Sequence, residues 1–307
     1  MSAIEMVNPE NCACHSPQES RIFDQHKGKK DKHYETHKRV FDLIATFEGQ
    51  TPYIDVERAL YFTESMAETE GQPLPLRWAK ALYNVASKIS VAVEPGQLLL
   101  GRCGGKVGRY GILYPELDGD FLDIAVRDLP TREQSPAKIT QEDAKIVMEQ
   151  IAPFWKGKTY HEALNKALPE WVHKLTYVDK DGLISRFVVN ETSSFRSSIQ
   201  WVHDYEKVLV RGFNGIKAEA EEKLAALDPD NPVHNADIRP FLEAVCIVSD
   251  AIILWANRNA DAAEAEAKKC TDPVRKAELL KMAAIARKVP AEPASNFYEA
   301  VQSQWFT

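Results

Sequence analysis

The sequence is poor in cysteine and lacks any apolar stretch long enough to cross a bilayer. Five cysteines are present, at scattered positions: Cys12, Cys14, Cys103, Cys246 and Cys270. Their odd number and irregular spacing argue against a disulfide framework and favour reduced thiols. No apolar run approaches the roughly 20 residues of a transmembrane helix. The N-terminus also lacks the basic segment and apolar core of a secretory signal, so the sequence predicts a soluble, cytoplasmic protein.

Positive charge is scarce as well. The 38 Lys and Arg residues are outnumbered by 45 Asp and Glu, and the formal net charge is −7. This balance argues against a nucleic-acid or anionic-membrane binder, whose affinity rests on clustered basic residues. The one basic run, Lys27–Lys32, is typical of a solvated tail. The chain has 307 residues, 44% of them hydrophobic, which is enough for one large domain or two ordinary ones.

Metal-binding motifs are incomplete. Cys12 and Cys14 stand one residue apart, whereas zinc-binding cysteine pairs have two to four residues between them. His33 and His37 lie in the order H-x-E-x-H rather than the H-E-x-x-H of zinc proteases, so we expect an exposed helix start. An acidic cluster resembles a calcium loop superficially: Glu116, Asp118, Asp120 and Asp123. Its glycine and terminal glutamate are misplaced, so a solvated acidic turn is expected there, and no metal site is predicted.

A glycine-rich segment, GRCGGKVGRYG at residues 101–111, fails the phosphate-binding loop pattern. Position 100 is not glycine, and neither Ser nor Thr follows Lys106. We expect these glycines to allow positive φ and close approach of the backbone. No nucleophile elbow is present, and the chain contains no self-sufficient catalytic constellation.

Apolar residues recur at helical spacing along most of the chain. We expect helices from His37 onward and over Val56–Thr69 (with Asp55 as N-cap), Arg77–Ile89, Thr140–Phe154, Tyr160–Leu168, Ile238–Ala267 and Asn296–Phe306. Short strands are expected around the Pro-Gly turn of 90–101, and a hairpin over Leu175–Val189. From Ser194 the chain is predicted to be nearly all helix. Because the last helix stops at Thr307 without a cap, we expect a longer polypeptide.

The segment Thr192–Gly215 holds the most specific candidate site. Arg196 and Gln200 are four residues apart, which places them on one face of the predicted helix. A guanidinium fork beside a primary amide can bind one small oxyanion. The alternative is an ordinary surface arginine with its stem packed and its head in water. His203, one turn beyond Gln200, is expected to be a packed or surface histidine.

Four segments then carry a family resemblance. They are Arg58–Pro75 (leading into RWAKALYNVASKI), Val93–Gly101, Asp204–Leu224 and Arg275–Phe306. In this order they resemble the N-terminal half of the pyruvate formate-lyase-like glycyl radical enzymes, and the stretch from the first to the last segment covers about four-fifths of the chain. One departure concerns only the subfamily: many members have a cysteine where this chain has Ala286-Arg287.

The resemblance implies a ten-stranded α/β barrel surrounded by helices, of which this chain is the mostly helical N-terminal portion with a few short strands. Residues 1–33 are then a polar arm, and 34–307 the first part of the large domain, truncated at 307. A separate S-adenosylmethionine/iron–sulfur activating enzyme installs a radical on a glycine, which generates a thiyl radical on a cysteine. That cysteine, a glutamate and the glycine are expected beyond residue 307, so no catalytic residue and no bound cofactor are assigned here.

The Arg196–Gln200 pair also bears on the subfamily. Diol and glycerol dehydratases have a histidine at the position of Gln200, whereas Arg-x-x-x-Gln resembles the isethionate sulfite-lyases. This implies cleavage of isethionate to acetaldehyde and sulfite, with Arg196 and Gln200 binding the sulfonate. The alternatives are an eliminase for choline, a diol or hydroxyproline, and a non-catalytic truncated subunit. The resemblance also implies a homodimer in the cytoplasm or a bacterial microcompartment, with a sulfonate substrate, the activating enzyme as partner, and no nucleic acid or membrane.

Overall fold

The structure is a computed structural model that describes residues 32–47, 49–102, 104, 108, 110–117, 119, 121–133, 136–171, 178–180, 183–185 and 203–307. Arg196 and Gln200 and the greater part of the predicted polar arm lie outside these residues.

The described part of the chain is mostly helical. Its α-helices are α2 (Lys32–Phe47), α3 (Glu57–Glu68), α4 (Leu74–Lys88), α5 (Phe121–Arg127), α6 (Gln141–Ile146), α7 (Ala152–Trp155), α8 (Tyr160–Ala167), α11 (Tyr205–Ala225), α12 (Arg239–Lys269), α13 (Pro273–Lys288) and α14 (Phe297–Phe306). Shorter helical turns are η2 (Leu129–Thr131, 3₁₀), η3 (Val147–Ile151, π) and η5 (His234–Ile238, π). The strands are β1 (Tyr53–Asp55), β2 (Tyr110–Ile112), β3 (Val178–Lys180) and β4 (Leu183–Ser185).

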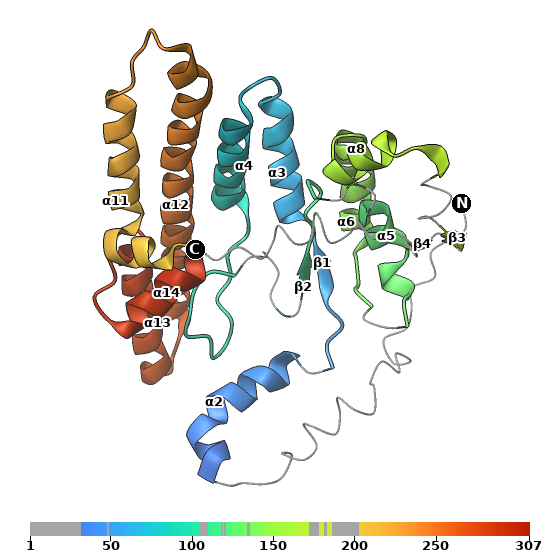
Figure 1. Ribbon diagram of the computed structural model, residues 1–307. Helices are drawn as coiled ribbons and strands as arrows, with labels where there is room; N and C mark the ends of the chain where they lie inside the picture. The colour runs from blue at the N-terminus through green and yellow to red at the C-terminus, as the bar shows by residue number, and fades with distance from the viewer. Residues whose placement is uncertain are drawn as a thin grey trace.

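The long helix α12 organises one half of the molecule. It packs against α4, α11 and α13, with α11 antiparallel beside it (Figure 1). Small residues allow close approach of α12 and α13: Ala256, Ala260 and Ala263 on α12 and Ala283 and Ala286 on α13 are all buried. Arg258 on α12 also donates to the carbonyl oxygens of Ala86 and Ile89, 2.6 and 2.7 Å away, so α12 caps the end of α4.

A second core lies around the parallel strands β1 and β2, in the centre of Figure 1. Tyr53 is in register with Tyr110, and on its other side forms a parallel bridge to Lys138. Helices α3 to α7 cover this pair. Phe62 is fully buried between Trp78 and Trp155, and the Trp155 indole donates to the Thr63 hydroxyl at 2.8 Å.

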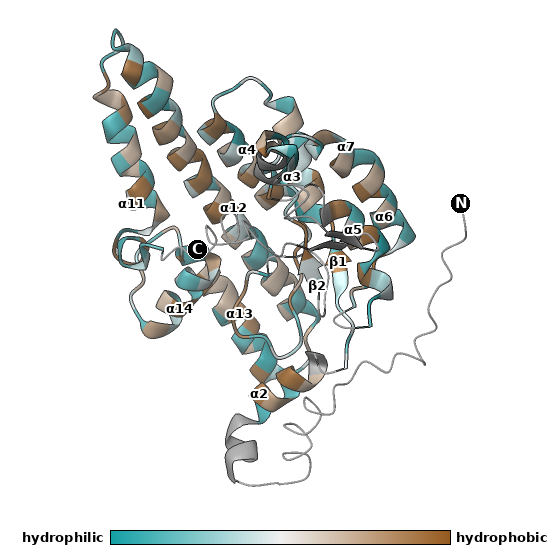
Figure 2. Ribbon diagram, turned by 45° about the vertical axis from the view of Figure 1, so that its right-hand side comes forward, coloured by the Kyte–Doolittle hydropathy of each residue, from teal (hydrophilic) through white to brown (hydrophobic). Residues whose placement is uncertain are grey.

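Most of the predicted helices are confirmed, with small shifts at their ends. The β3–β4 hairpin is confirmed as well. Helix α4 begins three residues earlier than predicted. Asp55 accepts a bond from the Glu57 amide, although Val56 occupies the N-cap position. Figure 2 shows polar and apolar residues side by side along α11 and α12, as expected of helices with one buried face.

The short strands predicted within 90–101 are wrong. Within the described residues this segment has no ladder partner, and side chains from other helices bond to its backbone instead. The amide of the fully buried Gln302 accepts from the Leu100 N–H and donates to the Leu100 carbonyl, both at 2.8 Å. The Trp305 indole donates to the Gly101 carbonyl at 2.7 Å, and Tyr298 donates to Leu98. One face of α14 therefore takes the place of a neighbouring strand.

The ten-stranded barrel is not seen in the described residues, whose strands form two separate pairs. Among the described helices, none is long and apolar enough to cross a membrane.

Candidate functional site

The predicted anion-binding pair, Arg196 and Gln200, lies outside the described residues, and the structure begins again at His203. His203 and Asp204 are not helical, and the Asp204 carboxylate accepts from the Lys207 amide at 3.1 Å. Asp204 is therefore the N-cap of a new helix, α11. The prediction of a helix running unbroken through this point is wrong, so His203 is not one turn beyond Gln200 on a continuous helix. The exposed His203 ring contacts Tyr205 instead.

Helix α11 is itself two helices joined by a sharp break. Gly212 has φ 63° and ψ 171°, a conformation that interrupts the helical path between Arg211 and Phe213. A Cβ at this position would lie 2.3 Å from the carbonyl oxygen of Ala291. Only glycine fits this conformation and this close approach together. The first part, Tyr205–Arg211, can therefore point in a different direction from the second.

The break is bonded to the turn between α13 and α14. The amides of Phe213 and Asn214 donate to the carbonyl oxygens of Pro290 and Ala291, at 2.9 and 3.0 Å. In the other direction, the Ala294 amide donates to the Leu209 carbonyl at 3.1 Å. These bonds satisfy backbone groups that the interruption would otherwise leave unpaired. They also fix the break against a segment some 80 residues further along the chain.

A single carboxylate bridges the two parts of α11. Glu219 lies in the second part, and its Oε2 is 2.6 Å from Arg211 and 3.2 Å from Lys207, both in the first. Its other oxygen is 2.8 Å from Lys223. The hydrogen bonds from Lys223 and Lys207 lower the pKa of Glu219 to about 2. The carboxylate is therefore ionised throughout the neutral range.

The second part of α11 is attached to the bundle. Lys217 Nζ lies 2.8 and 2.9 Å from the two carboxylate oxygens of Asp250 on α12, and this contact raises the pKa of Lys217. Phe213 and Ala220 are buried between the helices. The second part of α11 is therefore attached to α12, and Glu219 binds the first part to the second.

The glycine-rich segment begins at Gly101, whose carbonyl is bound by Trp305 of α14. Gly101 has φ 98° and approaches Phe306 so closely that a Cβ would lie 2.6 Å from the ring, as the sequence predicted for these glycines. Arg102 pairs with Glu94, whose carboxylate also accepts from the Gly108 amide at 2.8 Å. Through these two contacts Glu94 stabilises the conformation of this loop.

The acidic cluster is not the solvated turn that was expected, at least at Glu116. Arg58 binds the two carboxylate oxygens of Glu116 at 2.5 and 3.2 Å, and the Glu116 side chain is only 3% exposed. The guanidinium also stacks over the rings of Phe62 and Tyr114, 4.9 and 4.2 Å from their centroids. The described residues contain no group of three His, Cys, Asp or Glu side chains able to hold a metal ion.

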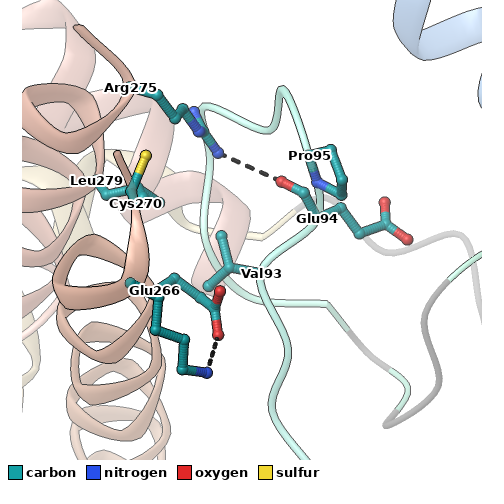
Figure 3. Close-up of a pocket in the computed structure, with 8 residues that line it drawn as sticks. Val93, Glu94, Pro95, Glu266, Cys270, Arg275 and Leu279 are labelled. Carbon is teal, nitrogen blue, oxygen red and sulfur yellow. Dashed lines mark hydrogen bonds and ion pairs between the residues drawn. The ribbon is translucent and has the colours of Figure 1, made fainter. Parts of the chain in front are cut away.

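A shallow pocket of about 240 Å³ lies between the 93–97 loop and helices α12 and α13 (Figure 3). Its lining is Val93, Glu94, Pro95, Glu266, Lys269, Cys270, Arg275 and Leu279. Arg275 donates to the carbonyl oxygens of Gln97 and Glu94, and Lys269 pairs with Glu266 at 2.8 Å. Arg275 therefore holds the loop against α13, whereas the Lys269–Glu266 pair lies within α12.

Comparison with known proteins identifies the architecture. Residues 32–307 match the pyruvate formate lyase-like family. The chain belongs to this family. Among solved structures, the B12-independent glycerol dehydratase from Clostridium butyricum, with glycerol bound, superimposes with a TM-score of 0.74. The match is 31% identical and covers 88% of this chain and 33% of that one, so the helices seen here correspond to one portion of a glycyl radical enzyme.

Much closer relatives of this pyruvate formate lyase-like chain are named isethionate sulfite-lyases. The protein from Bilophila wadsworthia (strain 3_1_6) is 73% identical over 292 residues, which are 95% of this chain and 35% of the relative. That from Desulfovibrio desulfuricans (strain ATCC 27774 / DSM 6949 / MB) is 69% identical over 296 residues, 96% of this chain and 36% of the relative. The chain thus spans about a third of the length of these curated relatives.

The break at Gly212 and the ion pairs of Glu219 across it were not predicted from the sequence. A signal was present: Gly212 and Gly215 interrupt a run of otherwise good helix formers. Nothing in the local sequence shows that Glu219 meets Lys207, because that contact exists only after the chain bends.

Proposed function

We propose that the full-length protein is a glycyl radical carbon–sulfur lyase that converts isethionate to acetaldehyde and sulfite. The observation that carries this proposal is the gap in similarity between relatives: 73% identity to an isethionate sulfite-lyase against 31% to the glycerol dehydratase. An eliminase for a diol, choline or hydroxyproline and a non-catalytic subunit remain the competing functions for the experiment below.

Arg196 and Gln200 are proposed to bind the sulfonate. A sulfonate has three acceptor oxygens and one delocalised charge, which match a guanidinium fork beside an amide N–H. As the carbon–sulfur bond breaks, negative charge accumulates on the departing sulfite, and these donors stabilise it. A diol carries no anion to offset a buried arginine, so Arg196 favours the sulfonate over a diol.

The radical chemistry is assigned to residues beyond 307. In this proposal a cysteine thiyl radical takes hydrogen from the hydroxyl-bearing carbon, a glutamate removes the hydroxyl proton, and sulfite leaves with the electron pair of the carbon–sulfur bond. The remaining formylmethyl radical takes the hydrogen atom back from the cysteine thiol, which gives acetaldehyde and restores the thiyl radical. The glycyl radical is installed by an S-adenosylmethionine/iron–sulfur activating enzyme. The barrel, the cytoplasmic homodimer and the division into a 1–33 arm and a 34–307 domain portion belong to the same proposal and are supported by family membership.

The outer face of α14 supports a larger assembly around this chain. Phe297 and Trp305 are 85% and 56% exposed, and with Val301 they lie on one face at i, i+4 and i+8. Other side chains of α14, Gln302 and Phe306, pack against the 98–101 segment and α12, and the Trp305 indole N–H also bonds to Gly101. Large apolar side chains that are this exposed on one face of a helix are typical of a surface that another segment covers. We propose that the remaining two-thirds of the polypeptide covers this face.

The proposed function is tested on the full-length protein after activation, with the glycyl radical quantified by electron paramagnetic resonance. Arg196→Lys keeps the charge but loses the fork, and Gln200→Leu removes the amide. Both variants are expected to lose at least about 10²-fold in kcat/KM for sulfite release, as other transition-state donors do. Arg211→Lys, which keeps a charge near Glu219, is the matched control and is expected to retain activity. Unchanged sulfite release by both test variants would remove the sulfonate role.

A further inference from the structure

The turn between α11 and α12 lies at the end of a long helical hairpin, at the top of Figure 1. Helix α11 ends at Ala225, and η5 begins at His234 and leads directly into α12. The loop of residues 226–233 joins these two ends. Most of its residues are exposed, so its conformation depends on hydrogen bonds more than on buried apolar contacts.

Two asparagine side chains form the hydrogen bonds of this loop that do not depend on pH. Asn231 Oδ1 accepts from the backbone amides of Val233 and His234, at 2.9 and 3.3 Å. Asn235 donates from Nδ2 to the carbonyl oxygen of Pro229 at 2.6 Å. A carboxamide does not change its charge in the physiological range, so these bonds persist wherever the protein is folded.

His234 forms a bond of a different kind. The backbone amide of Asp228 donates to His234 Nδ1 at 3.2 Å. A backbone amide can only donate, so Nδ1 must accept, and the ring must be neutral with its hydrogen on Nε2. An imidazolium has hydrogen on both nitrogens and cannot accept this bond. Histidine is also the side chain that ordinarily changes its charge between pH 5 and 8.

We propose that His234 is a pH-sensitive switch in the tip of the α11–α12 hairpin. The neutral ring holds the start of the loop, at Asp228, against the start of η5. When a proton binds to Nδ1, the Asp228 amide loses its acceptor and bonds to water, and this part of the loop separates from η5. The bonds of Asn231 and Asn235 remain, so the tip loosens while α11 and α12 stay folded.

The charges around the loop favour this change of partner. Helix η5 packs chiefly against α12. The charged side chains of the loop and of the helix turns on either side of it are Glu221, Glu222, Lys223, Asp228, Asp230, Asp237, Arg239 and Glu243. Carboxylates predominate among them, and Arg239 donates from Nε to Asn235 Oδ1 at 3.3 Å. An imidazolium at His234 therefore has carboxylates of the same hairpin tip with which to pair.

Hydrogen–deuterium exchange of the full-length protein at pH 7.5 and pH 5.5 tests this switch. No radical activation is needed, because the inference does not depend on the proposed function. Each rate is divided by the intrinsic exchange rate at the same pH, which gives a protection factor. In the wild type, the protection of residues 226–236 is expected to fall about fivefold at pH 5.5, the effect of one hydrogen bond of ordinary strength. The protection of α13 is expected to stay the same.

Substitutions at position 234 separate the acceptor from its titration. His234→Asn keeps an acceptor oxygen close to the position of Nδ1 but does not titrate, so its protection is expected to be high at both pH values. His234→Ala has no acceptor and is expected to show low protection at both. His203→Asn changes an exposed histidine that contacts Tyr205, and this matched control is expected to keep the pH dependence of the wild type.

Three results would overturn the switch. The first is equal protection of 226–236 at the two pH values in the wild type. The second is a fivefold pH dependence that persists in His234→Asn, which would assign the effect to another group. The third is wild-type protection in His234→Ala at pH 7.5, which would show that the bond to Asp228 does not hold the loop.

Discussion

Lys207 Nζ lies 3.2 Å from Glu219 Oε2, although twelve residues separate the two positions. In a straight α-helix, twelve residues span about 18 Å. The contact is possible only because the chain turns sharply at Gly212. The bend brings together a short helix that follows the Arg196–Gln200 segment and a longer helix that is anchored to the bundle.

Replacing Gly212 by alanine is expected to destabilise the protein strongly. The new Cβ would lie 2.3 Å from the Ala291 carbonyl oxygen, and the residue would still need positive φ. The combined strain and clash are expected to cost about 3 kcal/mol or more. Gly71→Ala is the control, because Gly71 has φ 85° with nothing within 4 Å of its Cβ position and should cost only about 1 kcal/mol. Equal thermal unfolding midpoints for the two variants would contradict the close contact at Gly212.

The ion pairs of Glu219 are expected to form throughout the neutral pH range and to be lost only in acid. The folded pKa of Glu219, about 2, lies below its ordinary value of 4.5, so its contribution to stability is present above pH 4.5 and declines as the pH falls toward 2. The difference in unfolding midpoint between wild type and Glu219→Gln should therefore be constant from pH 8 to 5 and shrink below 4.5. A difference that changes between pH 6 and 8 would assign the effect to another group.

Gln302 is expected to be sensitive even to an apolar residue of similar size. Gln302→Leu leaves the Leu100 N–H and carbonyl without their partners in a fully buried site, at a cost of about 1–3 kcal/mol for each group. Gln304→Leu, at an exposed position on the same helix, is the matched control and is expected to stay within about 0.5 kcal/mol of the wild type. Chemical denaturation of the full-length protein measures both. A Gln302→Leu variant as stable as its control would refute the role of α14 as a substitute strand.

Glu116 provides a test of a buried ion pair. Glu116→Ala leaves the Arg58 guanidinium, 12% exposed, without its carboxylate, which is expected to cost about 3–5 kcal/mol. Asp123→Ala removes the exposed partner of Arg127 and is expected to cost less than about 1 kcal/mol. Thermal unfolding of both variants at neutral pH distinguishes the two sites. Similar unfolding midpoints for the two variants would show that Glu116 behaves as a solvated residue, as the sequence predicted.

The helices could be predicted from local patterns, because capping residues and apolar periodicity involve residues that are close in the sequence. Asn296 and Asp272 cap the two last helices as such residues usually do. The irregular 94–101 segment could not be predicted from its own residues, since several of its hydrogen-bond partners lie far along the chain, on α13 and α14. The bend in α11 could not be predicted for the same reason, because it depends on a contact with a distant segment. Lys207 and Glu219 become neighbours only where Gly212 packs against the turn at Ala291. The sulfonate pair rests on sequence resemblance, since Arg196 and Gln200 lie outside the described residues.

The central claim is tested most directly by the product that the activated full-length enzyme forms from isethionate. The account predicts sulfite and acetaldehyde in equal amounts, formed only when the glycyl radical is present, with no dehydration of propane-1,2-diol or glycerol under the same conditions. Dehydration of a diol without sulfite release from isethionate would contradict it.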